Sequence, residues 1–237
     1  MARRDLTQRT SWDDSHGVVA YTADALSVAG EDGDEGAGAL ARPVEKLLEQ
    51  WEKLDDERRA KRRAVGRANA LVRRRDVQAD SAVTALHHDV LGHVKQDRTA
   101  SLFVRLFPDP LSGVVRLSLE SQLPVMRALA RELADAETPA AVKKAHTKPL
   151  AESIERGESA LRTREEAFVA AARTSARIAS WRDDVNHALR GVEGALQQIA
   201  SERRLGGEWV DAFFPSVERG KKRMKGTPAA PEGDVPA

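Results

Sequence analysis

Apolar residues recur mostly every three or four positions from residue 43 to residue 98, with gaps at the charged residues 55–59 and 73–76, and no proline interrupts the pattern before Pro108. This spacing is typical of a helical seam close to the heptad period. One helix over residues 43–98 would be about 84 Å long at 1.5 Å per residue. Because a single amphipathic helix of that length cannot bury its apolar stripe alone, we expect it to pack against a second long helix.

A second long seam follows in the last third of the chain. Pro149 opens it, and Gly206-Gly207 ends it. Abundant Ala, Leu, Glu and Arg, with only five Phe and one Tyr, argue against a β-rich fold. The sequence therefore predicts an all-α fold, an elongated helical bundle built on two long helices. It leaves open whether the two helices run parallel or antiparallel.

Three ranges divide the chain. Residues 1–16 are polar and without periodicity, so we expect a flexible arm. Residues 17–215 are expected to form a single all-helical bundle domain. Residues 216–237 begin basic and become rich in Pro and Gly, which predicts a disordered tail.

Inside the domain, the positions of Gly and Pro predict shorter elements. A short helix is expected over 17–29 and an acidic, Gly-rich flexible linker over 30–41. Pro124 predicts a break or a fresh first turn, and residues 138–148 are expected to be a connector.

The order of this punctuation also predicts an internal duplication with pseudo-twofold symmetry. Repeat A covers about 17–108 and repeat B about 113–215. A Gly-Val-Val sequence opens each repeat, a proline opens each long seam, and Phe-Pro closes each repeat, at Phe107-Pro108 and Phe214-Pro215.

Charge is balanced in total but segregated along the chain. The 38 Lys and Arg nearly match the 37 Asp and Glu. Residues 24–57 hold eleven acids and three bases, whereas residues 58–75 hold nine bases and no acid. The tail adds further bases at 219–225. The sequence-level candidates for binding an anionic partner are Arg58, Arg59, Lys61, Arg62, Arg63, Arg67, Arg73, Arg74, Arg75, Lys221, Lys222, Arg223 and Lys225.

Two interpretations of the basic stretch stay open. Its guanidinium groups could bind phosphates of a nucleic acid. Alternatively, they form a solvated face paired with acids of a neighbouring helix. An antiparallel pair about the midpoints would bring Asp183 and Asp184 opposite Arg62 and Arg63, and a parallel pair would bring Glu165 and Glu166 near Arg59. Helical spacing places Arg58, Arg62 and Arg75 at or beside the seam, while Arg59, Arg63 and Arg67 point elsewhere.

Aromatic residues gather at the two Phe-Pro segments. They either plug the ends of the bundle or form an exposed docking patch. The residues concerned are Phe103, Phe107, Trp209, Phe213 and Phe214.

Catalytic and metal-binding patterns are missing from the sequence. No Cys is present, which excludes disulfides, Cys-ligated metals and thiol catalysis. No Gly-rich phosphate loop, GxSxG or HExxH sequence occurs. Asp89 and His93 share a helix face, and an enzyme or metal carrier would have to use His88, His93 and His187, without a matching second pair. We therefore expect no enzyme activity, no metal and no cofactor.

These observations predict a non-catalytic helical scaffold or adaptor with a protein partner or self-association. The alternative is a nucleic-acid-binding helical protein that uses 58–75 and 219–225. No apolar run is long enough to span a membrane and no secretory signal is visible, so we expect a cytoplasmic protein without membrane insertion. The preference for Arg over Lys resembles that of proteins from high-GC bacteria.

Overall fold

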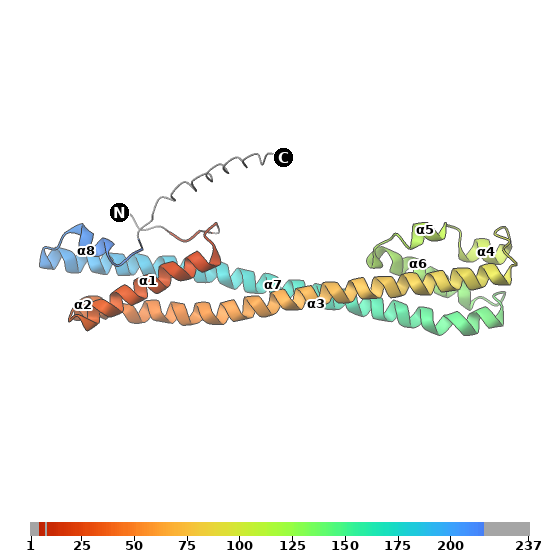
Figure 1. The fold of residues 1–237 in the computed structure, drawn as a ribbon, viewed down its shortest axis with the longest axis horizontal. Coiled ribbons are helices and arrows are strands. Elements are labelled where there is room, and N and C mark those ends of the chain that lie inside the picture. The colour runs from red at the N-terminus through yellow and green to blue at the C-terminus, as the bar shows by residue number, and fades with distance from the viewer. Residues whose placement is uncertain (1–4, 8, 216–237) are drawn as a thin grey trace, which may run out of the picture. The chain divides into compact units, whose positions relative to one another are not determined.

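The computed structural model describes residues 5–7 and 9–215, which form eight helices and no strand (Figure 1). This confirms the all-α prediction, and both expected long helices are present. The helices are α1 (Trp12–Glu31), α2 (Glu35–Gly38), α3 (Ala41–His93), α4 (Ser101–Leu106), α5 (Leu111–Val114), α6 (Leu119–Ala134), α7 (Ala140–Arg203) and α8 (Gly207–Asp211). The expected disordered tail, with Lys221, Lys222, Arg223 and Lys225, lies outside the described residues.

Two compact units divide the chain. Unit 1 combines residues 1–52 with 179–237, and unit 2 is residues 53–178. The long helices α3 and α7 contribute residues to both units. The single bundle domain expected over residues 17–215 stays a prediction.

Unit 1 is organised around a cluster of indole rings from three helices. Trp12 of α1 stacks on Trp51 of α3 with ring centroids 5.3 Å apart, and it meets Trp181 of α7 edge-on at 5.1 Å. The Trp181 Nε1 donates to the Leu47 carbonyl over 3.0 Å. These contacts join α1, α3 and α7 within the unit, and aromatic pairs of this geometry add stability beyond their buried area.

The N-terminal segment is not a loose arm over its described residues. The Asn186 side chain on α7 both donates to the Leu6 carbonyl and accepts from the Leu6 amide, each over 2.8 Å, and Leu6 is buried. Ser11 accepts from the Asp14 amide as the N-cap of α1, which begins at Trp12 rather than near residue 17. The arm prediction failed because distant side chains of α7 fix this segment: besides Asn186, Arg182 donates to the Thr10 carbonyl over 2.9 Å and Arg190 donates to Asp5 over 2.6 Å.

The Gly-rich segment expected as a flexible linker contains α2. A Cβ atom at Gly38 would lie only 2.6 Å from the Cα of Gly30, so the backbones of the two residues touch. Gly33 has φ +90, in the left-handed region that favours glycine. The glycines therefore permit a tight turn between α1 and α2.

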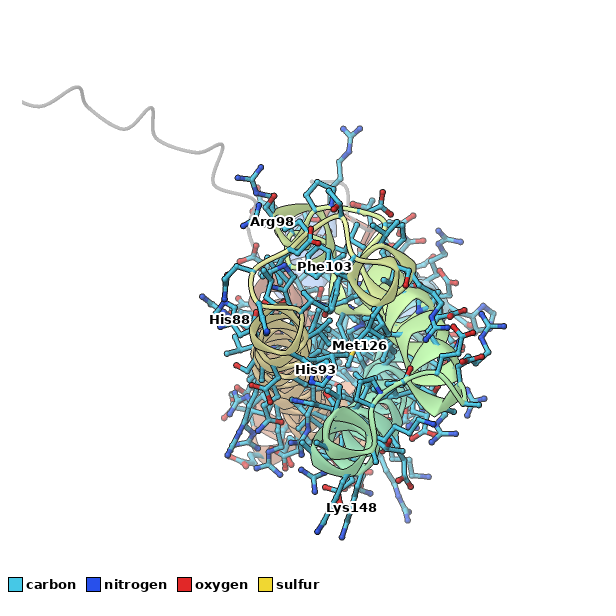
Figure 2. The ribbon with its side chains drawn as sticks, turned by 90° about the vertical axis from the view of Figure 1, so that its right-hand side faces the viewer. His88, His93, Arg98, Phe103, Met126 and Lys148 are labelled. Atoms are coloured by element: carbon cyan, nitrogen blue, oxygen red, sulfur yellow. The ribbon has the colours of Figure 1, made fainter. Side chains whose placement is uncertain are left out.

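Unit 2 contains a core in which α6 packs on α3 and α7 (Figure 1). Met126 of α6 is fully buried, and Figure 2 shows it among the helices, whereas Lys148 lies at the periphery. Gly157 of α7 permits the close approach of α6, because a Cβ there would meet Leu123 Cδ2 at 2.9 Å and Leu119 Cδ1 at 3.3 Å.

Two prolines lie inside helices rather than at their starts. Pro124 is in α6, where a break was expected, and Pro149 is in α7, which begins at Ala140 within the expected connector. Both prolines are exposed, so solvent can reach the backbone around them. The core contacts of α6 outweigh the cost of about 3 kcal/mol for an interior proline.

The internal duplication is not confirmed. Each half contains a medium helix before a long one, but the matched prolines occupy different places. Pro43 is in the first turn of α3, whereas Pro149 lies nine residues after the start of α7. The helix expected to reach residue 98 ends at His93, and Lys95 and Gln96 adopt positive φ.

Candidate functional site

The basic stretch lies on an antiparallel helix pair of unit 2. The Thr174 hydroxyl of α7 donates to Glu57 Oε1 of α3 over 2.8 Å, and further along the unit His146 Nε2 lies 2.6 Å from Asp89 Oδ2. Between these two contacts the residue number on α7 falls as the residue number on α3 rises, so the two helices run antiparallel. This register places residues near Val169, and not Asp183 or Asp184, opposite Arg62.

We call residues 58–75 of α3 and 162–177 of α7 the two-helix stretch. The α3 part holds nine bases and no acid, and the α7 part holds four Arg and two Glu. The stretch therefore has an excess of eleven positive charges, while the whole chain has a formal charge of +1. The solvated-face interpretation requires an acidic face on a neighbouring helix. The α7 part of the stretch, with four Arg against two Glu, does not supply one.

Six arginines of α3 share one face. At 100° per residue they fall within an arc of about 140°, opposite the buried seam position Ala68. All six are exposed, Arg62 included, so the expectation that Arg62 lies beside the seam is wrong. The remaining bases of 58–75, namely Arg58, Lys61 and Arg75, are half-buried. The six arginines are Arg59, Arg62, Arg63, Arg67, Arg73 and Arg74.

Few of these charges are neutralised. Asp55, which is buried, lies 2.7 Å from the Arg58 guanidinium and 2.6 Å from that of Arg59. Arg75 donates to the Gln78 side chain instead of to an acid. The other five exposed arginines have no hydrogen bond or ion pair to any residue within 5–7 and 9–215: Arg62, Arg63, Arg67, Arg73 and Arg74.

Glu57 marks the edge of the stretch. The Thr174 hydroxyl, and then the charges of Arg177 and Lys61, lower the pKa of the Glu57 carboxyl. Glu57 also forms an ion pair with Arg177. This carboxylate is thereby used within the helix pair and does not neutralise the arginine face of α3.

The five aromatics flagged in the sequence do not form one exposed patch. Phe103 and Phe107 are buried in unit 2, where both rings contact His87 at centroid distances of 5.4 and 4.9 Å. In unit 1, Phe213 and Phe214 are buried, and Trp209 packs edge-on against Phe213 at 5.0 Å. Four of the five rings are therefore buried, and Trp209 is half-buried.

The histidines are not assembled into a metal site. Asp89 contacts His146, which the sequence did not single out, rather than His93. Figure 2 labels His88 and His93 on α3, and both are exposed. Burial, and then the charges of His88 and Arg98, lower the pKa of His87. Among the described residues, no group of three or more His, Asp or Glu side chains is placed to hold a metal ion.

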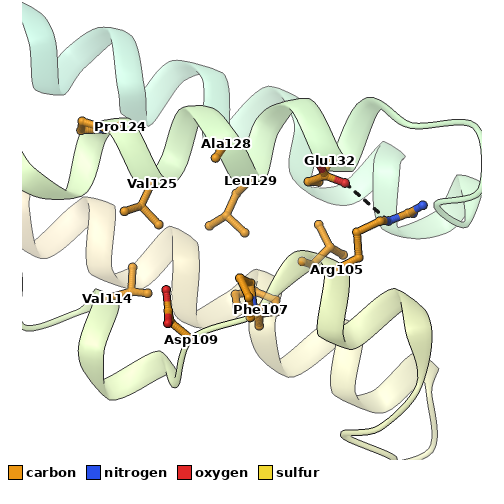
Figure 3. Close-up of a pocket in the computed structure, with 11 residues that line it drawn as sticks. Arg105, Phe107, Asp109, Val114, Pro124, Val125, Ala128, Leu129 and Glu132 are labelled. Atoms are coloured by element: carbon orange, nitrogen blue, oxygen red, sulfur yellow. Dashed lines mark ion pairs between the residues drawn. The ribbon is translucent and has the colours of Figure 1, made fainter.

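An apolar pocket of about 480 Å³ lies between α6 and the α4–α5 segment of unit 2 (Figure 3). Arg105 at its edge donates to Glu137 over 2.8 Å and to Asp135 over 3.2 Å, and lies 3.5 Å from Glu132. Asp109 also lines it. The sequence could not identify this pocket, because its walls come from three separate segments. The apolar wall is formed by Leu106, Phe107, Pro108, Val114, Pro124, Val125, Ala128 and Leu129.

A smaller hollow of about 200 Å³ opens where α6 begins. Asn69 and Arg73 of α3 line it together with Leu161 and Arg164 of α7. Asp76 also lines it, and burial, together with the nearby Asp80 charge, raises the pKa of Asp76, against a hydrogen bond from the Leu119 backbone. The hollow thus marks the border between the part of the helix pair that α6 covers and the two-helix stretch.

Within residues 5–7 and 9–215, no helix combines the length and apolarity needed to cross a bilayer. Comparison of the chain with known protein families, with curated proteins and with solved structures finds no match.

Proposed function

We propose that this chain is a non-catalytic helical protein that binds a nucleic acid along the two-helix stretch. The observation that carries the proposal is the excess of eleven positive charges, with five exposed arginines that have no acidic partner among the described residues. Like charges at this density repel one another, and phosphates would neutralise them while releasing counterions.

The dimensions of the arginine face suit a phosphate backbone. From Arg59 to Arg74 the face extends about 22 Å at 1.5 Å per residue. Each strand of a DNA duplex presents a phosphate about every 3.4 Å along the axis, so about six phosphates of a stacked strand span the same length.

The residue type favours phosphate over the carboxylates of an acidic protein surface. Eight of the nine bases in 58–75 are Arg. Guanidinium groups bind phosphate oxygens through paired, charge-assisted hydrogen bonds, and they are less strongly hydrated than the ammonium of Lys. A nucleic acid therefore uses this face better than a scattered set of Asp and Glu does.

A salt series of oligonucleotide binding tests the proposal. The wild type should bind at low salt, and log K should fall linearly with log salt. Substituting Arg63, Arg67 and Arg74 by Gln should weaken binding and reduce the slope by about 0.7–0.9 for each phosphate that the variant no longer neutralises.

A matched control removes the same charge elsewhere in unit 2. Arg116, Arg131 and Lys144 are exposed and without an ion pair among the described residues. Their triple substitution by Gln should leave affinity and slope close to wild type. No binding at low salt, or an equal decrease in affinity in the two triple variants, would contradict the proposal.

A protein-interaction role, including self-association, is the second candidate. It is supported by the apolar pocket of Figure 3, which is large enough for a bulky side chain. Sedimentation equilibrium should then give a mass that rises with concentration, and Ala128→Arg, which places a charge in the pocket, should abolish the rise. A constant monomer mass would remove self-association as the use of this pocket.

A further inference from the structure

An exposed aromatic side chain lies within the two-helix stretch. Phe168 of α7 is 49% exposed, although it belongs to an apolar stripe with Ile154 and Leu161 at seven-residue spacing. Ile154 and Leu161 pack against the unit 2 core, to which α6 contributes. Since α6 begins at Leu119, beside Gly157, it does not extend as far as Phe168.

On the same side of the helix pair, the charged residues of α3 change from acidic to basic where the cover of α6 ends. Under α6 they are acidic: Asp80 accepts from the Gln122 side chain over 2.8 Å, and Asp76 faces the start of α6. One heptad earlier on the same face come Arg73 and Asn69, and two heptads before Asp76 comes Arg62.

The hollow of about 200 Å³ identifies the side of the helix pair on which these residues lie. Asn69 and Arg73 line it together with Leu161 and Arg164, so these four side chains share one side of the helix pair. Phe168 follows Leu161 by seven residues and Arg164 by four, which keeps it on that side. Because the helices are antiparallel, moving from Leu161 to Phe168 on α7 means moving from Arg73 toward Arg62 on α3.

We propose that Phe168, flanked by Arg62 and Arg73, is a base-stacking platform, and that the nucleic acid bound by the two-helix stretch is single-stranded. A base in a duplex has both faces covered by its neighbours, whereas an unpaired base can stack on an exposed ring while arginines bind the adjoining phosphates. This inference rests on the proposed function and adds the strand type and the residue that recognises it.

The experiment compares three ligands in filter binding: a 20-nucleotide single strand, its duplex, and a single strand of the same length without bases. The wild type should prefer the single strand with bases. Phe168→Ala should weaken binding to that strand about tenfold and leave binding to the baseless strand unchanged. Phe168→Trp should keep the affinity.

Three controls separate stacking from other effects. Phe168→Leu keeps an apolar side chain and should behave like Phe168→Ala. Val169→Ala, at a neighbouring 45% exposed position on another face of α7, should bind as wild type. Arg62→Gln with Arg73→Gln should weaken binding to all three ligands and reduce the salt slope, because those arginines bind phosphates.

The outcomes distinguish the two proposals. Equal affinity of wild type and Phe168→Ala for the single strand, with weaker binding in the arginine variants, overturns the stacking platform and leaves the nucleic-acid function standing. A wild-type preference for the duplex also overturns it. Absence of binding to every ligand at low salt overturns both. Circular dichroism of each variant checks that the helices are retained.

Discussion

Within unit 2, the same two helices are used in two different ways. Where α6 covers them, fully buried side chains such as Met126 and Leu133 form a core, and the acids Asp76 and Asp80 meet polar groups of α6. In the α3 part of the two-helix stretch Ala68 is the one buried residue, and the outer faces carry arginines. The comparison teaches that a long seam can stabilise a fold in one part and display charge in the next.

Of the changes that distinguish the covered part from the two-helix stretch, the removal of buried side-chain volume should have the largest effect on the free energy of unfolding. Met126→Ala creates a cavity under α6, so we expect it to lower the free energy of unfolding by about 2–5 kcal/mol. Phe168→Ala in the two-helix stretch should change it by less than about 0.5 kcal/mol. Urea denaturation followed by far-ultraviolet circular dichroism measures both. Similar decreases in the two variants would mean that the stretch is packed as tightly as the covered part.

Two helical glycines, Gly66 in the two-helix stretch and Gly157 under α6, test how closely α6 packs on α7. Gly66 has nothing within 4 Å of an added Cβ, so Gly66→Ala should stabilise by about 0.5–1 kcal/mol through helix propensity. Gly157→Ala has the same advantage in propensity but meets Leu123 at 2.9 Å. We expect it to be neutral or destabilising. An equal stabilisation at both positions would show that α6 is free to move away from α7.

Charge repulsion should give a smaller effect confined to the two-helix stretch. Arg59, Arg63 and Arg67 follow one another at four-residue spacing, where like charges destabilise by about 0.2–0.5 kcal/mol per pair. Replacing Arg63, Arg67 and Arg74 by Gln should raise the melting temperature at low salt, and the increase should vanish near 1 M salt. The triple variant of Arg116, Arg131 and Lys144 should show no increase. An unchanged melting temperature at every salt concentration would argue against repulsion.

Two carboxylates should respond to pH in opposite directions, with the smallest effects. The pKa of Asp76 is raised, mainly by burial, so its ionised form costs stability and Asp76→Asn should stabilise at neutral pH. The pKa of Glu57 is lowered, first by Thr174, so Glu57→Gln should destabilise there. The stability from Glu57 is present above its unfolded pKa and is lost as pH falls through the folded value.

Melting temperatures at pH 3, 5 and 7 test this pair. The difference between each variant and the wild type should shrink as the pH falls from 7 to 3, because protonation removes the wild-type charge that the variant lacks. Shifts of the same sign at pH 7 would contradict the assignment of the two environments.

The sequence predicted what depends on local periodicity. The uninterrupted seam identified α3, and the Gly206-Gly207 pair identified the end of α7. It failed where tertiary contacts decide. Pro124 was expected at a break or a fresh first turn and Pro149 at a helix start, but packing against the core keeps both inside helices.

The candidate site was predicted in part. The nine bases of 58–75 are visible in the sequence, but their relation to Phe168 is not, because it depends on where α6 begins and on the helix register. The tryptophan cluster of unit 1 was also missed, since Trp12, Trp51 and Trp181 are far apart in the chain. Equally, the buried Phe103 and Phe107 could not be told from exposed rings by position alone.

The tryptophan cluster has a practical consequence for spectroscopy. All four tryptophans of the chain, at positions 12, 51, 181 and 209, belong to unit 1, and residues 53–178 contain none. Intrinsic tryptophan emission therefore reports the melting of unit 1 alone, while ellipticity reports both units. A gap between the two curves would measure how independently the units unfold, and Phe168→Trp would give unit 2 an emitter of its own.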